Sequence, residues 1–189
     1  MLDVALKFLV DELNTYLLTR TDSDFGQAEL CKLVDDSGKW AVTEDHVGAS
    51  IISIEEERTF RSQLPERTYV DGKHVVLEPE LKLNLHIMFA ANFKNYDQGL
   101  KYISHVLTFF QAHANFTHAQ YPNLDSDIQK LTAELQSLSY EQLNQVWAFI
   151  GGKQLPSVLY KVRMVVLQDI EQRSVEPPLT EIKTTIHGE

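Results

Sequence analysis

The sequence has little cysteine, little glycine and no long apolar run, and each shortage excludes a class of protein. Its one cysteine, Cys31, cannot form an intramolecular disulfide, and its apolar surroundings predict a small buried side chain. The 8 glycines form neither a G-x-G-x-x-G nor a Walker pattern, so no phosphate-binding loop is expected. No window approaches the roughly 20 apolar residues of a membrane span. Charged residues interrupt the N-terminal apolar stretch, so it is not a signal peptide, and we expect a cytoplasmic protein.

Positive charge is also in short supply. There are 17 Lys and Arg residues against 27 Asp and Glu, a formal net charge of -10. Such a chain repels phosphate groups, so neither nucleic acid nor an anionic membrane surface is an expected partner. The length of 189 residues fits one domain with a core of its own, which needs no metal or disulfide to fold.

Helical periodicity marks three segments. Leucines at three- and four-residue spacing predict a helix over residues 2–19, and a similar stripe predicts a second over 95–113. Asn95 is the expected N-cap of the second helix, with Gln98 three residues on as a weak capping-box pattern. Ser139 and Gln142 form a full capping box that opens a short third helix, which Gly151-Gly152 ends. Trp147 lies in the apolar stripe of this helix and is expected in the core.

Alternating apolar residues predict strands over 28–34, 49–57, 81–93, 128–138 and 157–168. In 81–93 every odd position is apolar, so one face is expected on the core and the other less buried. The pattern fades over 58–80, which predicts a long loop or an extended hairpin turning at Asp71-Gly72.

These elements predict an α/β (α+β) fold. We expect a mixed, mostly antiparallel sheet of about five strands with about three helices packed on it, as one domain over residues 1–169. Residues 170–189 contain Pro177-Pro178 and only a weak strand pattern at 180–186. They are interpreted as a C-terminal arm that a partner can order.

Residues capable of catalysis do not form a recognisable site. There is neither a G-x-S-x-G elbow nor an H-E-x-x-H motif, and we expect no enzyme, no cofactor and no metal. The loosest metal candidates are His105, His113 and His118. The first two lie roughly 12 Å apart along a helix, too far for one zinc ion, and all three are interpreted as exposed.

Glu55 and Glu57 would share one side of a strand. Because Arg58 and Arg61 are close in sequence, salt bridges are favoured there over acid–base catalysis. Across a subunit boundary the same charges could select a partner.

Five blocks together resemble a known family: residues 6–17 (LKFLVDELNTYL), 52–58 (ISIEEER), 83–93 (LNLHIMFAANF), 140–147 (YEQLNQVW) and 155–165 (LPSVLYKVRMV). They resemble the N-terminal domain of the cap, or tail-terminator, proteins of extracellular contractile injection systems of the virulence-cassette and antifeeding-prophage type. The resemblance covers roughly residues 1–170. It implies a structural subunit, six copies of which form a ring at the baseplate-distal end of the tube. The ring would stop polymerisation of the tube and sheath and anchor the last sheath layer.

The expected partners are therefore copies of the chain, the inner tube protein and the sheath protein. Segments 58–80 and 170–189 are expected to reach these partners. The residues predicted to lie in such interfaces are Trp40, Glu55, Glu57, Arg58, Arg61, Tyr69, Pro177 and Ile182. For Trp40 the alternative is packing within its own loop.

Three other functions stay open at this stage. The chain could be a tube–baseplate adaptor of the same machine. It could be a small hydrolase or metal-dependent enzyme that uses His86, His105 or the glutamates. It could also be a binding module with no link to injection machines.

Overall fold

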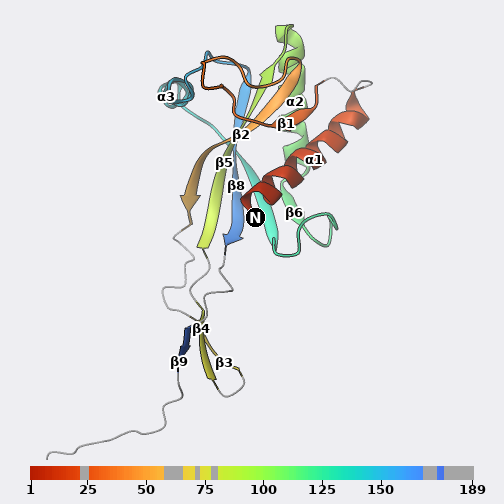
Figure 1. The fold of residues 1–189 in the computed structure, drawn as a ribbon. Helices are drawn as coiled ribbons and strands as arrows, with labels where there is room; N and C mark the ends of the chain where they lie inside the picture. Colours follow the sequence, from red (N-terminus) through yellow and green to blue (C-terminus); the bar gives the residue numbers. More distant parts are fainter. Residues whose placement is uncertain (22–25, 58–65, 71–72, 78–80, 168–173, 177–189) are drawn as a thin grey trace, which may run out of the picture.

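A six-stranded sheet and three helices make up most of the described chain in the computed structural model (Figure 1). The structure describes residues 1–21, 26–57, 66–70, 73–77, 81–167 and 174–176. The helices are α1 (Leu2–Arg20), α2 (Tyr96–Ala112) and α3 (Tyr140–Ile150). The strands of this sheet are β1 (Ala28–Leu30), β2 (His46–Glu56), β5 (Leu81–Asn92), β6 (Asn115–Thr117), β7 (Lys130–Gln136) and β8 (Ser157–Leu167). No helix in these ranges is long and apolar enough to span a membrane.

The strand order is β1-β2-β5-β8-β7-β6. Only β1 and β2 run parallel, and every other pair is antiparallel. The predicted α+β fold with a mixed, mostly antiparallel sheet is thus confirmed. The sheet has one strand more than expected because β6 is three residues long, too short for alternation to be recognised.

The main core lies between the sheet and the first two helices. The odd residues of β5, from Leu83 to Ala91, point to this side, and α1 buries Leu9 and Leu13 completely against it. Phe89, Phe110 and Tyr160 pack ring against ring at its centre. Each such side chain contributes about 1.5–3 kcal/mol by leaving water, so this layer holds the fold together.

A second, smaller core covers part of the opposite face. Met88 and Ala90, on the even side of β5, are buried under α3 and the segment 31–43, with Trp147 and Leu159 beside them. The expectation that the even side of residues 81–93 is less buried is therefore wrong at this end of the strand. The covering elements come from distant parts of the chain, so the pattern within one strand does not reveal them.

The two helix starts differ in how they are capped. Ser139 Oγ accepts a hydrogen bond from the Gln142 N–H at 3.2 Å, and Gln142 Oε1 accepts one from the Ser139 N–H at 3.0 Å. The predicted capping box of α3 is thus confirmed, and Gly151 ends the helix at φ 79°. Asn95 is the N-cap of α2, as predicted, but its side chain makes no capping hydrogen bond. The capping box predicted for Asn95 and Gln98 is therefore wrong.

A second sheet holds the three remaining strands, β3 (Glu66–Val70), β4 (Lys73–Leu77) and β9 (Ser174–Glu176), in the order β3-β4-β9. β3 and β4 pair antiparallel on either side of residues 71–72. Of the two alternatives for 58–80, the hairpin is therefore confirmed. β9 belongs to the predicted C-terminal arm and pairs with β4 through Val175 and Val75. In Figure 1 this sheet lies beyond the ends of β5 and β8. The pattern at 180–186 lies outside the described residues.

Candidate assembly surfaces

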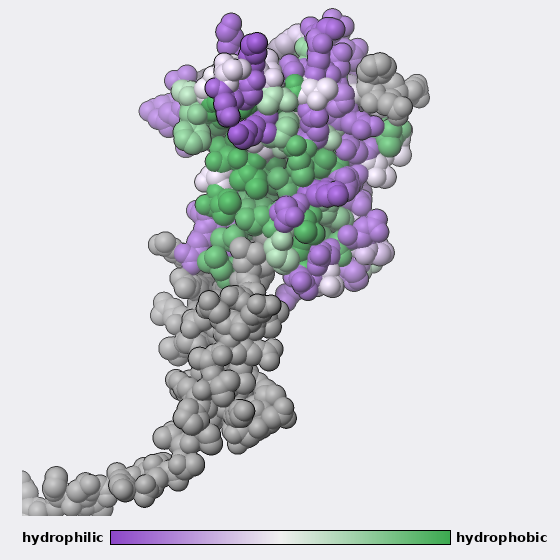
Figure 2. Space-filling model, in the orientation of Figure 1, coloured by the Kyte–Doolittle hydropathy of each residue, from purple (hydrophilic) through white to green (hydrophobic). Residues whose placement is uncertain are grey.

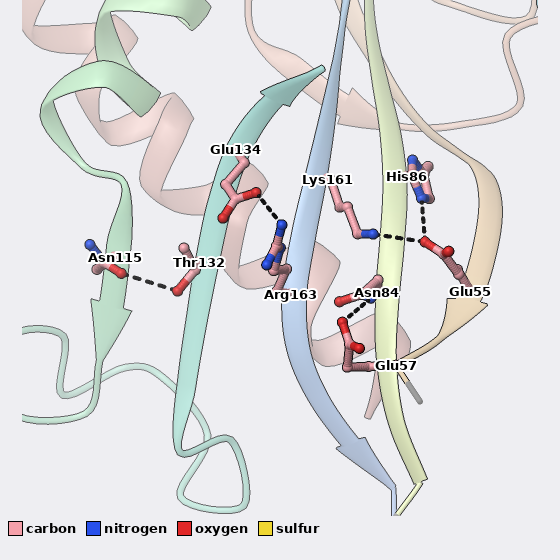
Figure 3. Close-up of polar contacts among 9 residues, drawn as sticks. All are labelled: Glu55, Glu57, Asn84, His86, Asn115, Thr132, Glu134, Lys161 and Arg163. Atoms are coloured by element: carbon pink, nitrogen blue, oxygen red, sulfur yellow. Dashed lines mark hydrogen bonds and ion pairs between the residues drawn. The ribbon is translucent and has the colours of Figure 1, made fainter. Parts of the chain in front are cut away.

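The half of the second face that α3 leaves uncovered carries a group of polar side chains, here called the polar stripe (Figure 3). Its members alternate with core residues along their strands, so they all point to the same side of the sheet. They come from β2 and the residue after it, β5, β6, β7 and β8. The polar stripe consists of Glu55, Glu57, Asn84, His86, Asn115, Thr132, Glu134, Lys161 and Arg163.

One carboxylate oxygen of Glu55 joins three strands. Glu55 Oε2 lies 2.8 Å from Lys161 Nζ on β8 and 3.3 Å from His86 Nε2 on β5. The Lys161 side chain is only 17% exposed, because it lies over β5 to reach Glu55. Hydrogen bonds from Lys161 and then from His86 hold the pKa of the Glu55 carboxyl below its ordinary value.

The rest of the polar stripe is joined by pairs between neighbouring strands. Asn84, 1% exposed, donates from Nδ2 to Glu57 Oε2 at 3.1 Å. An ion pair links Arg163 and Glu134 at 2.8 Å on β8 and β7. Thr132 and Asn115 add a 3.0 Å hydrogen bond between β7 and β6. The expectation that Glu55 and Glu57 share one side of the strand is confirmed.

These contacts favour recognition over catalysis. A carboxylate whose pKa is lowered by a lysine is a weak base near neutral pH, so Glu55 is poorly suited to accept a proton. Among the described residues no three His, Cys, Asp or Glu side chains are placed to hold a metal ion. Charges that are paired across strands can instead fix the register and orientation of a partner.

The histidines do not converge. His113 Nδ1 lies 2.7 Å from the Tyr121 hydroxyl, and His118 Nδ1 lies 2.9 Å from the Leu124 carbonyl. His105 Nε2 is buried without a partner, and burial lowers the pKa of this imidazole. His105 and His113 are half-buried, so their interpretation as exposed residues was wrong.

Trp40 is half-buried and contacts α3. Its ring meets that of Trp147 edge to face, with centroids 6.0 Å apart, and Trp147 is the buried core residue that was predicted. A Cβ on Gly152 would lie 2.9 Å from the Trp40 ring, so glycine leaves the space that Trp40 occupies. Cys31 packs against the same core and is half-buried. Burial raises the pKa of its thiol to about 11.

Two exposed aromatic residues at the ends of α3 were not identified from the sequence. Tyr140 is 95% exposed and Phe149 is 84% exposed. The usable signal was their position off the apolar stripe of an amphipathic helix. Exposed aromatic residues are frequent binding residues in protein interfaces.

The other predicted interface residues are not brought together within the described structure. Tyr69 lies on β3 opposite His74 on β4. Arg58, Arg61, Pro177 and Ile182 lie outside the described residues. The sequence also did not predict that Lys161, 106 residues from Glu55, would be its partner.

The comparisons with known proteins fit this fold. Residues 5–181 match the model of the Pvc16 N-terminal domain. The chain belongs to this family. The resemblance noted in the sequence is thereby confirmed, and no curated protein matches the chain.

Two structures solved by cryo-EM share the fold. One is the sheath/tube terminator of an extracellular contractile injection system, PVC, in its extended state, with a TM-score of 0.53, 16% identity and 95% of this chain covered. The other is the tube-terminating cap of the anti-feeding prophage, with a TM-score of 0.56, 13% identity and 92% covered. The chain spans 62% and 60% of the lengths of those two proteins.

Proposed function

We propose that the chain is a structural subunit that caps the baseplate-distal end of the tube and sheath in a phage-tail-like contractile injection system. In this role it stops polymerisation of both and anchors the last sheath layer. The observation that carries the proposal is the family match over residues 5–181, together with the fold shared with a sheath/tube terminator and a tube-terminating cap.

The surfaces of the described residues suit such a role. The polar stripe presents paired charges without a reaction centre, and α3 presents Tyr140 and Phe149 to solvent. We infer a non-enzymatic subunit that acts as a ring of six copies, assembles in the cytoplasm and contacts the tube and sheath proteins. The hairpin β3–β4 and the C-terminal arm, with Tyr69, Arg58, Arg61, Pro177 and Ile182, are proposed to reach those partners, as is Trp40.

The proposal is tested by adding the purified chain to growing tubes of the tube protein. Tube lengths are measured by negative-stain electron microscopy at increasing ratios of chain to tube protein. We expect lengths to shorten as the ratio rises, because each added ring removes a growing end. A matched addition, from which the chain has been removed after denaturation, controls for dilution of the tube protein. Lengths that do not depend on the ratio would contradict the capping role.

A further inference from the structure

Along each margin of the six-stranded sheet, a short outer strand covers only part of the neighbouring long strand and so leaves a step. The step on one margin is complementary to the step on the other. On one margin β1 pairs only with Val47–Ala49, so no described strand lies outside Ser50–Glu56 of β2. On the other margin β6 pairs only with Lys130–Thr132, and the Ala133 N–H bonds to the Ala114 carbonyl. No described strand lies outside Glu134–Gln136 of β7.

The register shows that the steps lie at opposite ends of the sheet. Ile54, Leu85, Val162 and Ala133 share one row across the four long strands. β6 begins one row beyond this, at Thr132, and extends toward Glu56, whereas β1 ends at the row of Ala49. β7 ends at the row of Ser50, before the rows that β1 occupies, so β1 is the outer strand at one end of the sheet and β6 is the outer strand at the other. In Figure 1, β2 and β6 lie at opposite sides of the sheet.

Exposed apolar side chains mark both margins on the same face. Ile54 on β2 is 49% exposed and Leu135 on β7 is 52% exposed. Their cross-strand partners Leu85 and Tyr160 belong to the main core, so both side chains point to the α1 side. Figure 2 shows apolar side chains gathered on this face beside α1. Unprotected edges with apolar residues are sites at which another strand adds.

Charge at the two margins is complementary. β2 ends with Glu55 and Glu56, whereas the β6–β7 margin ends with the exposed residue Lys130. Thr132 pairs with Arg163, and Leu83 pairs with both Glu56 and Val165, so the register places Lys130 near the level of Glu56. If two copies were placed side by side, opposite charges would therefore meet at this end of the joint.

We propose that the β2 margin of one copy joins the β6–β7 margin of a second copy, so that the sheet continues through the ring. This inference rests on the proposed function, which supplies the ring. The contact is heterologous, because one margin meets a different margin, and such contacts form a ring where the rotation from copy to copy closes. β6 would run parallel to the neighbouring β2. At the other end Asn14 already binds the backbone of Ala28 from outside, at 2.9 and 2.7 Å, so the backbone pairing is confined to β2 and β6.

The test is chemical cross-linking of Ile54→Cys with Leu135→Cys in one chain, in a Cys31→Ser background. β6 lies between β7 and the neighbouring β2, so the reagent is a bismaleimide that spans two strand spacings, about 10 Å. It is applied to the free chain and to the chain bound to tubes of the tube protein. We expect a ladder of covalent multimers in at least one of these samples, and either single variant alone should give none. The matched control pairs Leu135→Cys with Leu18→Cys, which is also 52% exposed but lies on α1 and not on β2.

Two outcomes overturn the proposal. One is the absence of a ladder in both samples while melting curves show that the variant is folded. The other is a dimer from Ile54→Cys alone, because it would mean that like margins meet. Tube lengths are measured in parallel with the same variants. Capped tubes without a ladder would contradict the proposed joint between copies and support the capping function. A ladder without capping would support the joint and contradict the capping function.

Discussion

Glu55 shows at the residue scale how charged groups are held on an open sheet face. Lys161 and His86, on strands distant in sequence, both donate to one oxygen of its carboxylate and hold the pKa of this group below its ordinary value. Proximity in the sequence predicted Arg58 and Arg61 as the partners of Glu55 and Glu57. The lysine pairs with Glu55 because β8 lies on the far side of β5, which no local pattern specifies.

The variant Glu55→Gln should lower the melting temperature at neutral pH. The folded-state pKa of Glu55 lies below its ordinary value, so the stabilisation is present above that value and is lost as the pH falls through the folded pKa. The difference in melting temperature from wild type should be full at about pH 7 and shrink below about pH 4.5. Calorimetry across this pH range measures the difference. Glu134→Gln is the control, because Glu134 and its partner Arg163 form an ion pair in which both side chains are exposed. A difference that does not change with pH would contradict this account of Glu55.

His105 should make folding less favourable in mild acid. Burial, then Lys101 and Arg20, lower the pKa of this histidine in the folded state. The unfolded chain therefore binds the proton more readily, so stability is full above the ordinary pKa near 6.5 and declines as the pH falls below it. His105→Gln should flatten this part of the stability curve, measured by urea unfolding between about pH 7 and 5. The control His118→Gln changes an exposed residue, and an equal flattening there would refute the assignment to His105.

At the scale of elements, the N-caps of α3 and α2 differ: the predicted side-chain capping bond forms at Ser139 and does not form at Asn95. Ser139→Ala should lower the free energy of unfolding by about 1 kcal/mol, because it removes the capping bond to the Gln142 N–H. Asn95→Ala should cost less than about 0.5 kcal/mol, because the Asn95 side chain makes no such bond. Chemical denaturation of both variants measures the contrast. Equal losses would mean that the cap at Ser139 does not contribute as described.

Long periodic elements were predictable because the repeat of apolar residues is the same property that buries them. The helix over 2–19 and the strand over 81–93 agree with α1 and β5 to within one residue at each end. β6 and the strand β9 were missed because three residues carry no period. The second core was missed because Trp40 and Trp147 meet only through the tertiary fold. Lys161 and Arg163 alternate with apolar residues in the sequence of β8, so this part of the polar stripe follows from the pattern, but the pairs that its residues form depend on strand order.

At the scale of the whole molecule, the C-terminal arm has two parts with different expected roles. Ser174–Glu176 pair with β4, so removing them changes the three-stranded sheet. Deleting residues 177–189 spares this pairing and should leave the melting temperature unchanged while weakening capping. Deleting 170–189 is the comparison variant that also removes β9. Circular dichroism and the tube-length assay measure the two effects, and unchanged capping by the shorter deletion would exclude residues 177–189 from the interface.

The position of the chain on an assembled particle tests the central claim most directly. Particles are assembled with the chain carrying a small gold-binding tag at its N-terminus and imaged by electron microscopy. The account predicts one label cluster per particle, at the end of the tube and sheath opposite the baseplate. Labels at the baseplate end would identify a tube–baseplate adaptor instead, and labels absent from both ends would contradict a structural role at the tube terminus.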